Sequence, residues 1–343
     1  MKCTPLRWGI IGCGSIANRF GADVVRLGDH KLQAIASRDA ERARHYSAKF
    51  GVPTPYMGAD AYNELVSDSE VDVVYVATPH NFHKDHVLMA LAAGKPVLCE
   101  KPFTVNAAET ELVVSTARQA GLFLMEGVWS RCFPVWRRVM QCITDGVIGD
   151  VRLLYSDFGF RAGSLGSDWR LTGYDPNGRL FDPNLAGGAL MDVGIYPISI
   201  AQMVFGNPVG IKAVGSLGSS GVDENVGVVM VFGQGQIATA TTSLQVTTPS
   251  TTTLLGTAGR IEVPSQWWRP KAFTIYRDGK DPERVELEHA GEGFQFEAME
   301  VASCLRRGRK ESDIVPLDAT LAVMRALDAV RVQLGLKFPM EDC

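Results

Sequence analysis

The sequence predicts an α/β protein with two domains, residues 1–126 and residues 127–343. Three observations support this fold class. The first 125 or so residues alternate between short apolar runs and helical segments, a glycine-rich loop directly follows the first of these runs, and short strands separated by turn residues dominate after Glu126. Alternating strands and helices are typical of a parallel sheet, and closely spaced strands of an antiparallel one. We therefore expect a parallel α/β domain, followed by an α/β domain with an open, mostly antiparallel sheet.

The composition is that of an ordinary globular protein. The 343 residues suffice for two domains that each bury a core, and the hydrophobic fraction of 46% and the charged fraction of 21% are average. A net charge of −4 gives no electrostatic reason to expect a nucleic-acid partner, and no Lys/Arg-rich run indicates an anionic membrane. No apolar run approaches the length of a membrane span. We therefore expect no nucleic acid and no membrane as partners.

The cysteines indicate a reducing compartment. They are scattered, odd in number and contain no C-x-x-C pair, which favours free thiols over a zinc site or a disulfide framework. The seven positions are Cys3, Cys13, Cys99, Cys132, Cys142, Cys304 and Cys343. The chain enters a strand within a few residues of its start, which leaves no room for a signal peptide. The cytoplasm is therefore the expected location.

A dinucleotide-binding motif follows the first strand. Residues 6–11 form a short apolar run, and residues 12–17 have the pattern G-x-G-x-x-A directly before a helix that starts near Ser15. Gly12 allows a tight turn, Gly14 lets a pyrophosphate approach the backbone, and the small Ala17 lets helix and strand pack closely. The free N–H groups of the helix start, around Ser15 and Ile16, then face the phosphates. Residues 1–126 are accordingly predicted to be a Rossmann domain.

The end of the second strand, residues 31–36, bears on the choice of cofactor. An acidic residue at this end would accept hydrogen bonds from the ribose 2′-OH of NAD, but the strand is followed by Ser37 and Arg38. A guanidinium and a hydroxyl suit the 2′-phosphate of NADP. Asp39 follows, so NAD stays an alternative, and Arg38 could also simply start the next helix, which carries Arg42 and Arg44. We favour NADP(H).

Polar side chains follow the next strand, residues 71–77. Thr78, His80 and His83 lie where they could contact the nicotinamide ribose or the substrate. Each histidine could equally cap or pack against the helix that follows. His86, inside that helix, is expected on its surface.

The fourth predicted strand, residues 96–99, ends in Glu100, Lys101 and Pro102. Ligands of open α/β sheets bind outside the carboxyl ends of the strands. A lysine there, beside a bound cofactor, could exchange a proton with an alcohol or a carbonyl. A solvated loop residue is the alternative, but the buried strand and the proline that fixes the turn favour a function for Lys101. A helix over about residues 107–119 and a strand over residues 122–125 complete the domain.

The second domain is predicted to be mainly strands, with a helix near residues 134–143, another near 188–205 and two at its end, about 294–307 and 317–333. The expected strands are residues 151–160, 211–217, 226–232, 236–244, 251–256, 260–263 and 272–276. The Thr-rich strand around residues 238–243 has small residues on both faces, which suits a sheet covered on both sides, one of them by another subunit. Residues 161–182, rich in Gly, Asp and Pro, are expected to form a loop excursion.

Asp192 and Tyr196 lie four residues apart in the helix that interrupts the strands, hence on one helical face. Their neighbours are apolar, so we expect at least one of the two polar groups to be partly buried. A buried carboxylate needs a partner, and a lysine from the first domain would serve. Asp192 could instead cap the helix start or pair with a structural arginine.

Taken together, these motifs resemble those of the Gfo/Idh/MocA oxidoreductase family. The similarity rests on residues 12–17, 99–102 and 187–196, and within the family it is greatest to the branch of dimeric dihydrodiol dehydrogenases and NADP-dependent D-xylose dehydrogenases. Residues 125–134 and the tail from residues 310–312 through 316–317 to 338–339 match that branch. The resemblance covers essentially the whole chain. It implies a Rossmann domain followed by an α/β domain whose open sheet commonly forms homodimers or higher homo-oligomers.

The resemblance also implies roles for particular residues. Lys101 would be the proton donor and acceptor, with Asp192 and Tyr196 beside it as further catalytic residues. The residues expected to contact the cofactor are Gly12, Gly14, Ser15, Ile16, Ser37, Arg38, Thr78, His80, His83, Glu100 and Lys101. The residues expected to contact the substrate are Trp129, Phe158, Asp192, Tyr196 and Trp268, although the aromatic ones could be ordinary core residues. The chain departs from related enzymes in its longer segment 161–182 and in Tyr196, where many members have histidine.

The expected activity is reversible hydride transfer between NADP(H) and a hydroxyl-bearing carbon of a polyhydroxylated small molecule, such as a sugar, a polyol or a trans-dihydrodiol. Lys101 would carry the proton, and no metal is expected. Two alternatives stay open. One is an inositol or anhydro-sugar oxidoreductase that uses NAD(H). The other is a non-catalytic regulator that senses NADP, although such a binder has no use for Lys101, Asp192 and Tyr196 together.

Overall fold

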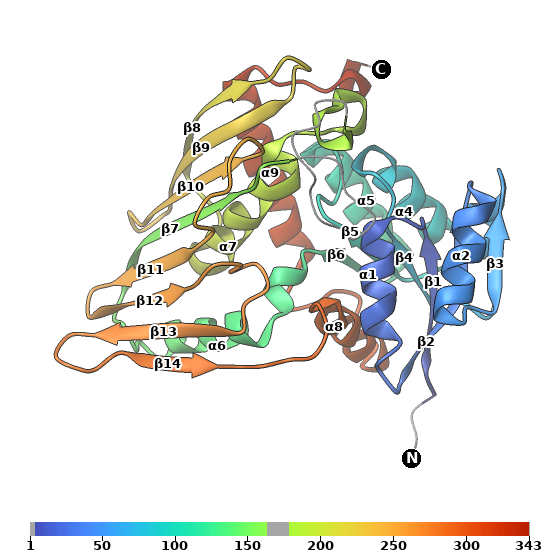
Figure 1. Ribbon diagram of the computed structural model, residues 1–343, viewed down its shortest axis with the longest axis horizontal. Coiled ribbons are helices and arrows are strands. Elements are labelled where there is room, and N and C mark those ends of the chain that lie inside the picture. The colour runs from blue at the N-terminus through green and yellow to red at the C-terminus, as the bar shows by residue number, and fades with distance from the viewer. Residues whose placement is uncertain (1–3, 163–177, 343) are drawn as a thin grey trace. The chain divides into compact units, whose positions relative to one another are not determined.

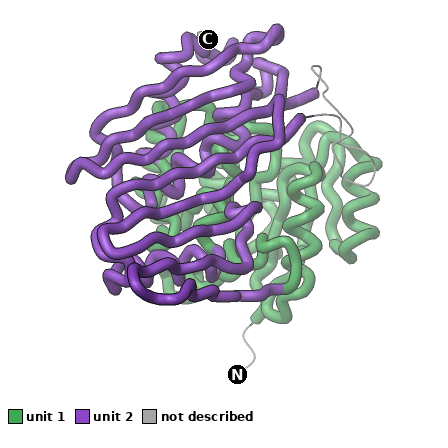
Figure 2. The backbone as a smooth tube through the Cα atoms, turned by 60° about the vertical axis from the view of Figure 1, so that its left-hand side comes forward, with its two compact units in different colours: residues 1–132, 290–320 green, residues 133–289, 321–343 purple. Residues whose placement is uncertain are grey.

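A computed structural model describes residues 4–162 and 178–342. The chain forms two compact units, Met1–Cys132 with Ala290–Thr320 and Phe133–His289 with Leu321–Cys343, which we call unit 1 and unit 2 (Figure 2). These units do not coincide with a division at residue 126, because the segment Ala290–Thr320 returns to unit 1. Most of the predicted loop excursion, residues 163–177, lies outside the described residues.

Unit 1 contains a six-stranded sheet in the order β3-β2-β1-β4-β5-β6, with every neighbouring pair parallel (Figure 1). Its strands are β1 (Leu6–Ile11), β2 (His30–Ser37), β3 (Thr54–Met57), β4 (Val73–Val76), β5 (Val97–Glu100) and β6 (Leu124–Gly127). Its helices are α1 (Ser15–Val24), α2 (Ala40–Phe50), α3 (Ala61–Ser67), α4 (His83–Ala92), α5 (Ala107–Ala120) and α8 (Phe294–Arg306), with short 3₁₀ turns η1 (His80–Phe82) and η2 (Trp129–Cys132). This order is that of the doubly wound dinucleotide-binding fold, so the prediction of a Rossmann domain is confirmed.

The sequence analysis missed one strand of this sheet. β3 is a short edge strand that contains a proline and is only partly buried, so its four residues give no apolar run. β5, which precedes Lys101, is therefore the fifth strand along the chain, and the count of four was wrong. The inner strands are buried along almost their whole length, as expected of a parallel sheet with both faces covered.

Unit 2 contains an eight-stranded sheet in the order β14-β13-β12-β11-β7-β10-β9-β8. Only β7 and β10 pair in parallel, so the prediction of a mostly antiparallel sheet is confirmed. The strands are β7 (Val151–Gly159), β8 (Gly210–Leu217), β9 (Asp223–Val231), β10 (Ile237–Ser243), β11 (Thr252–Gly256), β12 (Gly259–Val263), β13 (Ala272–Arg277) and β14 (Glu283–Glu286). The helical elements are α6 (Pro134–Thr144), α7 (Ile195–Phe205), α9 (Leu317–Leu334), whose first residues belong to unit 1, the π-helical turn η5 (Leu190–Gly194) and the 3₁₀ turns η3 (Arg179–Phe181), η4 (Pro183–Leu185) and η6 (Pro339–Asp342).

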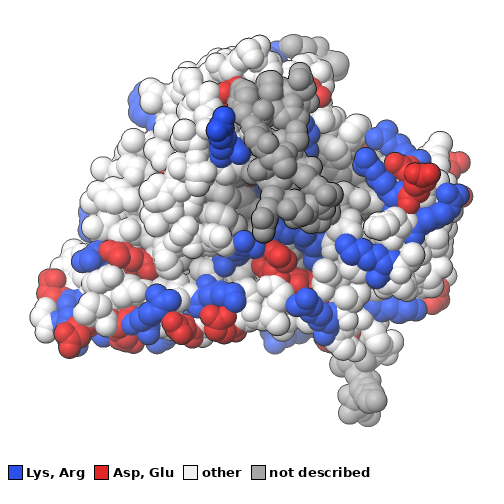
Figure 3. Space-filling model, viewed as in Figure 1, with Lys and Arg blue, Asp and Glu red and all other residues white. Residues whose placement is uncertain are grey.

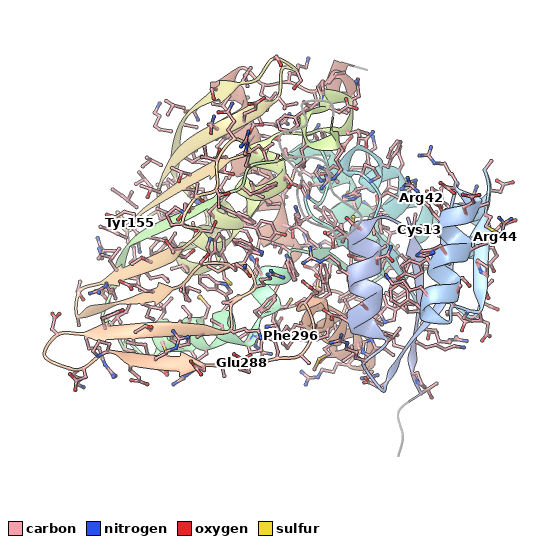
Figure 4. The ribbon with its side chains drawn as sticks, viewed as in Figure 1. Cys13, Arg42, Arg44, Tyr155, Glu288 and Phe296 are labelled. Atoms are coloured by element: carbon pink, nitrogen blue, oxygen red, sulfur yellow. The ribbon has the colours of Figure 1, made fainter. Side chains whose placement is uncertain are left out.

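The two faces of the large sheet differ. α7 and η5 pack on β7 and β10, so inward-pointing residues such as Ala238 and Ala240 are buried. The other face is open in this chain, and Tyr155 of β7 is 45% exposed on it. In Figure 4 the labelled Tyr155 points away from the helices. The small residues of β10 are thus covered on one side only within the described chain.

One statement about membranes needs correction. The stretch Pro183–Phe205, 23 residues with a mean hydropathy of 1.4, is long and apolar enough to cross a membrane by length and composition, so the statement that no apolar run approaches that length was wrong. Its most apolar window is 78% buried in the structure. Burial of that kind is typical of the core helix of a globular protein.

Candidate functional site

The loop after β1 has the geometry that a dinucleotide requires. Gly12 has φ 102°, and a Cβ atom there would lie 2.8 Å from the carbonyl oxygen of Ala77, so the turn needs glycine for the protein's own packing. Gly14 has an ordinary φ of −74°, and a Cβ atom there would meet nothing within 4 Å. The chain itself therefore gives no reason for glycine at this position. Open space above Gly14, at the N-terminus of α1, fits the close approach of a pyrophosphate.

The carboxyl end of β2 carries the residues predicted to select the cofactor. Arg38 is exposed, and its guanidinium carbon lies 5.6 Å from the ring centroid of Phe82. Ser37 is buried, and its hydroxyl accepts a hydrogen bond from the backbone N–H of Asp39 at 3.1 Å. The Asp39 carboxylate caps α2 by accepting from the N–H groups of Glu41 and Arg42. Because the Asp39 carboxylate is engaged with its own helix, it leaves the exposed Arg38 guanidinium available for a phosphate.

Two other side chains border this edge. Burial raises the pKa of the Cys13 thiol to about 11, so the thiol is protonated at neutral pH. Cys13 and Arg42 lie close together between α1 and α2, while Arg44 lies on another side of α2 (Figure 4). Residues two apart on a helix point in nearly opposite directions, so Arg42 can reach the dinucleotide loop and Arg44 cannot.

His83 is fully buried and joins the two segments that follow β4 and β5. Its Nδ1 lies 2.9 Å from the carbonyl oxygen of Pro102, and its Nε2 lies 2.8 Å from that of Thr78. Burial lowers the pKa of this imidazole. The structure therefore shows that His83 packs between these two segments, and its contact with the cofactor stays a prediction. The Thr78 hydroxyl is paired with Nδ1 of His86 at 3.0 Å, and His86 is half-buried, so the expectation that His86 lies on the surface was wrong.

Lys101 lies directly after β5 and is half-buried. The residue before it, Glu100, is buried and accepts hydrogen bonds from the Tyr75 hydroxyl at 2.5 Å and from the Lys101 backbone N–H at 3.1 Å. Burial raises the pKa of Glu100, while the Tyr75 hydroxyl and the Lys101 charge act in the opposite direction. The residue after it, Pro102, follows a cis peptide bond and is held by His83. Lys101 is thus held on both sides by buried contacts.

The second group of predicted site residues lies in unit 2. Asp192 stands in the π-helical turn η5, and its Oδ1 lies 3.5 Å from Nη2 of Arg179. Asp192 thus pairs with Arg179, an arginine partner of the kind that the sequence analysis considered. The start of this turn is held by Asp223, whose carboxylate accepts a 2.6 Å hydrogen bond from the Leu190 N–H. Burial raises the pKa of Asp223 to about 6.

An aromatic cluster lies beside Tyr196, the second residue of α7. Phe158 lies 5.6 Å from the Tyr196 ring and stacks on Trp268 with centroids 3.7 Å apart and an interplanar angle of 8°. The structure therefore brings three of the predicted substrate contacts together. Trp129 belongs to unit 1, where it stacks on Phe294 at 4.4 Å under the guanidinium of Arg19.

Several polar groups that could act at the site were missed by sequence reasoning. The buried ones include Glu126, Arg131, Asp223 and Glu297, and Arg19 is half-buried. Glu126 accepts a hydrogen bond from the Thr320 hydroxyl at 2.9 Å, and burial raises its pKa to about 7. One signal was available for Glu297: it falls on the apolar stripe of α8 formed by Phe294, Val301 and Cys304, at spacings of three and four residues.

No group of three or more metal-ligating side chains is found among residues 4–162 and 178–342. The cysteines in these ranges, Cys13, Cys99, Cys132, Cys142 and Cys304, are free thiols.

Comparison with known proteins agrees with this geometry. Residues 6–128 match the model of an oxidoreductase family with an NAD-binding Rossmann fold, and residues 136–262 match the GFO/IDH/MocA C-terminal domain. The trans-1,2-dihydrobenzene-1,2-diol dehydrogenase of Mus musculus is 37% identical to the chain, covering 98% of this chain and 99% of the relative. That of Homo sapiens is 35% identical, with the same coverage.

The chain belongs to the GFO/IDH/MocA oxidoreductase family. It is an enzyme whose first unit contains an NAD-binding Rossmann domain.

Solved structures of the family share the whole fold. A 3-ketoreductase from Actinomadura kijaniata in complex with NADP and TDP-benzene has a TM-score of 0.81 and 27% identity, covering 96% of this chain and 98% of that one. An aldose–aldose oxidoreductase from Caulobacter crescentus complexed with glycerol has a TM-score of 0.84 and 26% identity, covering 96% and 97%. The resemblance inferred from the sequence motifs is therefore confirmed.

Proposed function

We propose that the protein is an NADP-dependent dehydrogenase that acts on a hydroxyl-bearing carbon of a sugar, a polyol or a trans-dihydrodiol. The observation that carries this proposal is the position of Lys101. It follows β5 at the edge where open α/β sheets bind their ligands, and buried contacts of Glu100 and His83 hold the residues on either side of it. A solvated loop lysine would not need such support.

In this proposal, Lys101 Nζ takes the proton of the substrate hydroxyl during oxidation and returns it to the carbonyl oxygen during reduction. Bound NADP(H) would accept or supply the hydride. The lysine side chain must be uncharged to accept the proton, and the buried Glu100 carboxylate nearby stabilises the ammonium that results. General acid–base catalysis of this kind contributes about 10²–10⁴-fold to the rate.

The residues of unit 1 also support the proposed choice of cofactor. Gly12, Gly14, Ser15 and Ile16 would hold the pyrophosphate at the start of α1, and the exposed Arg38 would bind the 2′-phosphate with Ser37. The remaining predicted cofactor contacts are Thr78, His80, Glu100 and Lys101, together with His83, which would act through the Thr78 and Pro102 carbonyls. NAD(H) is the alternative cofactor.

The residues of unit 2 would recognise the substrate. Asp192 accepts and Tyr196 donates hydrogen bonds, which suits vicinal hydroxyl groups. The stacked Phe158 and Trp268 offer a flat apolar surface, which suits the face of a sugar or of a dihydrodiol ring. Trp129, whose ring stacks on Phe294 beside Arg19, stays a predicted substrate contact.

Among the substrate classes, the full-length similarity to dehydrogenases of trans-1,2-dihydrobenzene-1,2-diol favours a trans-dihydrodiol, whereas the glycerol-bound aldose–aldose oxidoreductase favours a sugar or polyol. The test is a panel of trans-dihydrodiols, aldoses, polyols, inositols and anhydro-sugars, each assayed with NADP and NAD by the absorbance of the reduced cofactor. We expect turnover with NADP on one of the first three classes. Turnover only on inositol or anhydro-sugars with NAD, or NADP binding with no turnover on any class, would contradict the proposal.

We further propose that the protein is a homodimer through the open face of the unit 2 sheet. The register places Val229, Thr239, Tyr155 and Thr253 in one row across β9, β10, β7 and β11. A second row contains Val231, Ile237, Leu153 and Leu255. An antiparallel sheet facing water normally shows charged and polar residues, so one row of apolar residues beside another of apolar residues and threonines supports an interface here.

The charge distribution supports the same face. Ion pairs gather on β12–β14 and the segment beside them, among them Arg260–Glu262, Arg277–Glu283 and Lys271–Glu288. The surface over β7–β11, by contrast, is largely uncharged (Figure 3). Interface centres are depleted of charge and their rims are polar. The free thiols in the described residues suit our further proposal that the enzyme works in the cytoplasm.

A further inference from the structure

Glu297 is the most unusual buried group that the proposed mechanism does not use. It lies in α8, its side chain is 0% exposed, and neither carboxyl oxygen has a hydrogen-bond partner among the residues that the structure describes. An ionised carboxylate in such a place would carry a large desolvation cost. The surroundings of Glu297 should therefore determine whether its carboxyl group is neutral or ionised.

The surroundings of Glu297 join it to the strand that ends at Lys101. A Cβ atom on Gly127 would lie 3.4 Å from Glu297 Oε2, and Gly127 pairs directly with Glu100 in the sheet. Glycine at position 127 thus leaves room for the Glu297 carboxyl group behind the end of β5. The charges of Glu100 and Asp23, together with burial, raise the pKa of Glu297 well above its ordinary value.

The distribution of hydrogen-bond donors decides which of the three acids is neutral. Glu100 accepts from the Tyr75 hydroxyl and from a backbone N–H, one on each carboxylate oxygen. Asp23 accepts from the backbone N–H groups of Glu292, Gly293 and Phe294 at the start of α8. A carboxylate that accepts several donors favours its charged form. Glu297 has none, so it holds the proton.

Other charged or titratable groups of unit 1 act on this pair or on its neighbours without giving Glu297 a donor. They are Arg19 on α1, Tyr75 on β4, Lys101 after β5, Glu126 on β6 and Arg131 in η2. Arg19 and Lys101 act on Glu100, whose pKa both lower. Arg131 lowers the pKa of the buried Glu126, whereas Glu100 raises it.

We propose that Glu297 is a positioning residue that stays a neutral carboxylic acid in the folded enzyme, so that Glu100 alone presents one negative charge behind Lys101. This inference rests on the proposed function of Lys101. A second negative charge at position 297 would repel Glu100 and weaken its bonds to Tyr75 and to the Lys101 N–H. Position 297 therefore requires a neutral side chain of glutamate shape.

The test compares wild-type protein with Glu297→Gln, which has the shape of the neutral acid, and uses the exposed Glu64→Gln on α3 as a control. Unfolding by urea is measured at a series of pH values between about 5 and 8. If the folded state keeps a proton on Glu297 and the unfolded state releases it, the unfolding constant of the wild type should rise relative to that of Glu297→Gln by about tenfold per pH unit. Glu64→Gln should show a ratio that does not change with pH.

A ratio independent of pH for Glu297→Gln would overturn the proposal, because it would mean that Glu297 is ionised in the folded enzyme. The measurement needs no substrate, so it stays valid even if Lys101 has no catalytic role. The positioning role has its own readout. Glu297→Gln should retain kcat and KM, whereas Glu297→Ala should lower kcat at least tenfold with unchanged NADPH affinity.

Unchanged kcat in Glu297→Ala would show that the residue is only structural and would overturn the positioning role. If Glu297→Ala does not fold, Glu297→Gln decides that role too, since a tenfold loss of kcat in a folded Gln variant would show that a neutral side chain does not suffice.

Discussion

Replacement of Arg38 by alanine tests the choice of cofactor. The guanidinium of Arg38 is exposed beyond the carboxyl end of β2, and the ring of Phe82, 5.6 Å away, orients it. Because the side chain is exposed, Arg38→Ala should change the free energy of unfolding by no more than about 0.5 kcal/mol. Its effect should instead appear in the binding of the 2′-phosphate.

The expected loss follows from the contacts that the guanidinium can make. Hydrogen bonds to a charged group contribute about 1.5–3 kcal/mol, which corresponds to a roughly 10–150-fold weaker Kd for NADPH. NADH has no 2′-phosphate, so its Kd should change by less than about twofold. The contact with Phe82 reduces the freedom of the side chain before binding, which favours the upper half of this range.

The assay is titration of each variant with NADPH and with NADH, followed by cofactor fluorescence at constant ionic strength. Arg44→Ala is the matched control. Arg44 is also an exposed arginine, but it lies on a side of α2 away from Cys13 and the dinucleotide loop (Figure 4). It should leave both constants unchanged. Equal affinity of the wild type for NADPH and NADH, or an equal loss for both in Arg38→Ala, would refute the assignment.

Three other outcomes can be measured directly. His83→Leu should lower the free energy of unfolding by about 1–3 kcal/mol, since the single N–H of the neutral imidazole no longer donates to one of the two carbonyls that face it, and an unchanged Tm would contradict the positioning role. The raised pKa of Asp223, about 6, means that the folded state binds more protons than the unfolded state between about pH 4 and 6, so stability falls as pH rises through this window. Asp223→Asn can still accept the hydrogen bond from the Leu190 N–H, so the free energy of unfolding should fall by about 2–3 kcal/mol less over this pH range than in the wild type. An unaltered pH dependence of urea unfolding would contradict the raised pKa of Asp223. Tyr155→Arg should shift sedimentation from dimer to monomer at micromolar concentration, and a dimer of undiminished affinity would exclude this face as the interface.

The sequence predicted the features that depend on local chemistry. The G-x-G-x-x-A loop has a defined spacing. From this spacing follow the start of α1 directly after Gly14 and the positive φ of Gly12. The end of β5 was predictable because an apolar run stops abruptly at Glu100. Strand β3 was not, because an edge strand with a proline carries no apolar run.

Features that depend on tertiary contacts were outside the reach of local patterns. The return of the segment Ala290–Thr320 to unit 1 brings Glu297 behind Glu100, and no spacing in the sequence indicates that pairing. The function of His83 likewise depends on two carbonyls from different loops. Tertiary packing also half-buries His86, which its place in a helix alone did not predict.

The most direct test of the central claim is the turnover of Lys101→Met. Methionine keeps most of the side-chain volume but cannot exchange a proton, so folding and NADPH binding should be preserved. With the best substrate of the panel, kcat should fall by about 10²–10⁴-fold with little change in KM. Lys31→Met, at an exposed position of β2, should leave both constants unchanged. Near-normal kcat in Lys101→Met would mean that another group carries the proton.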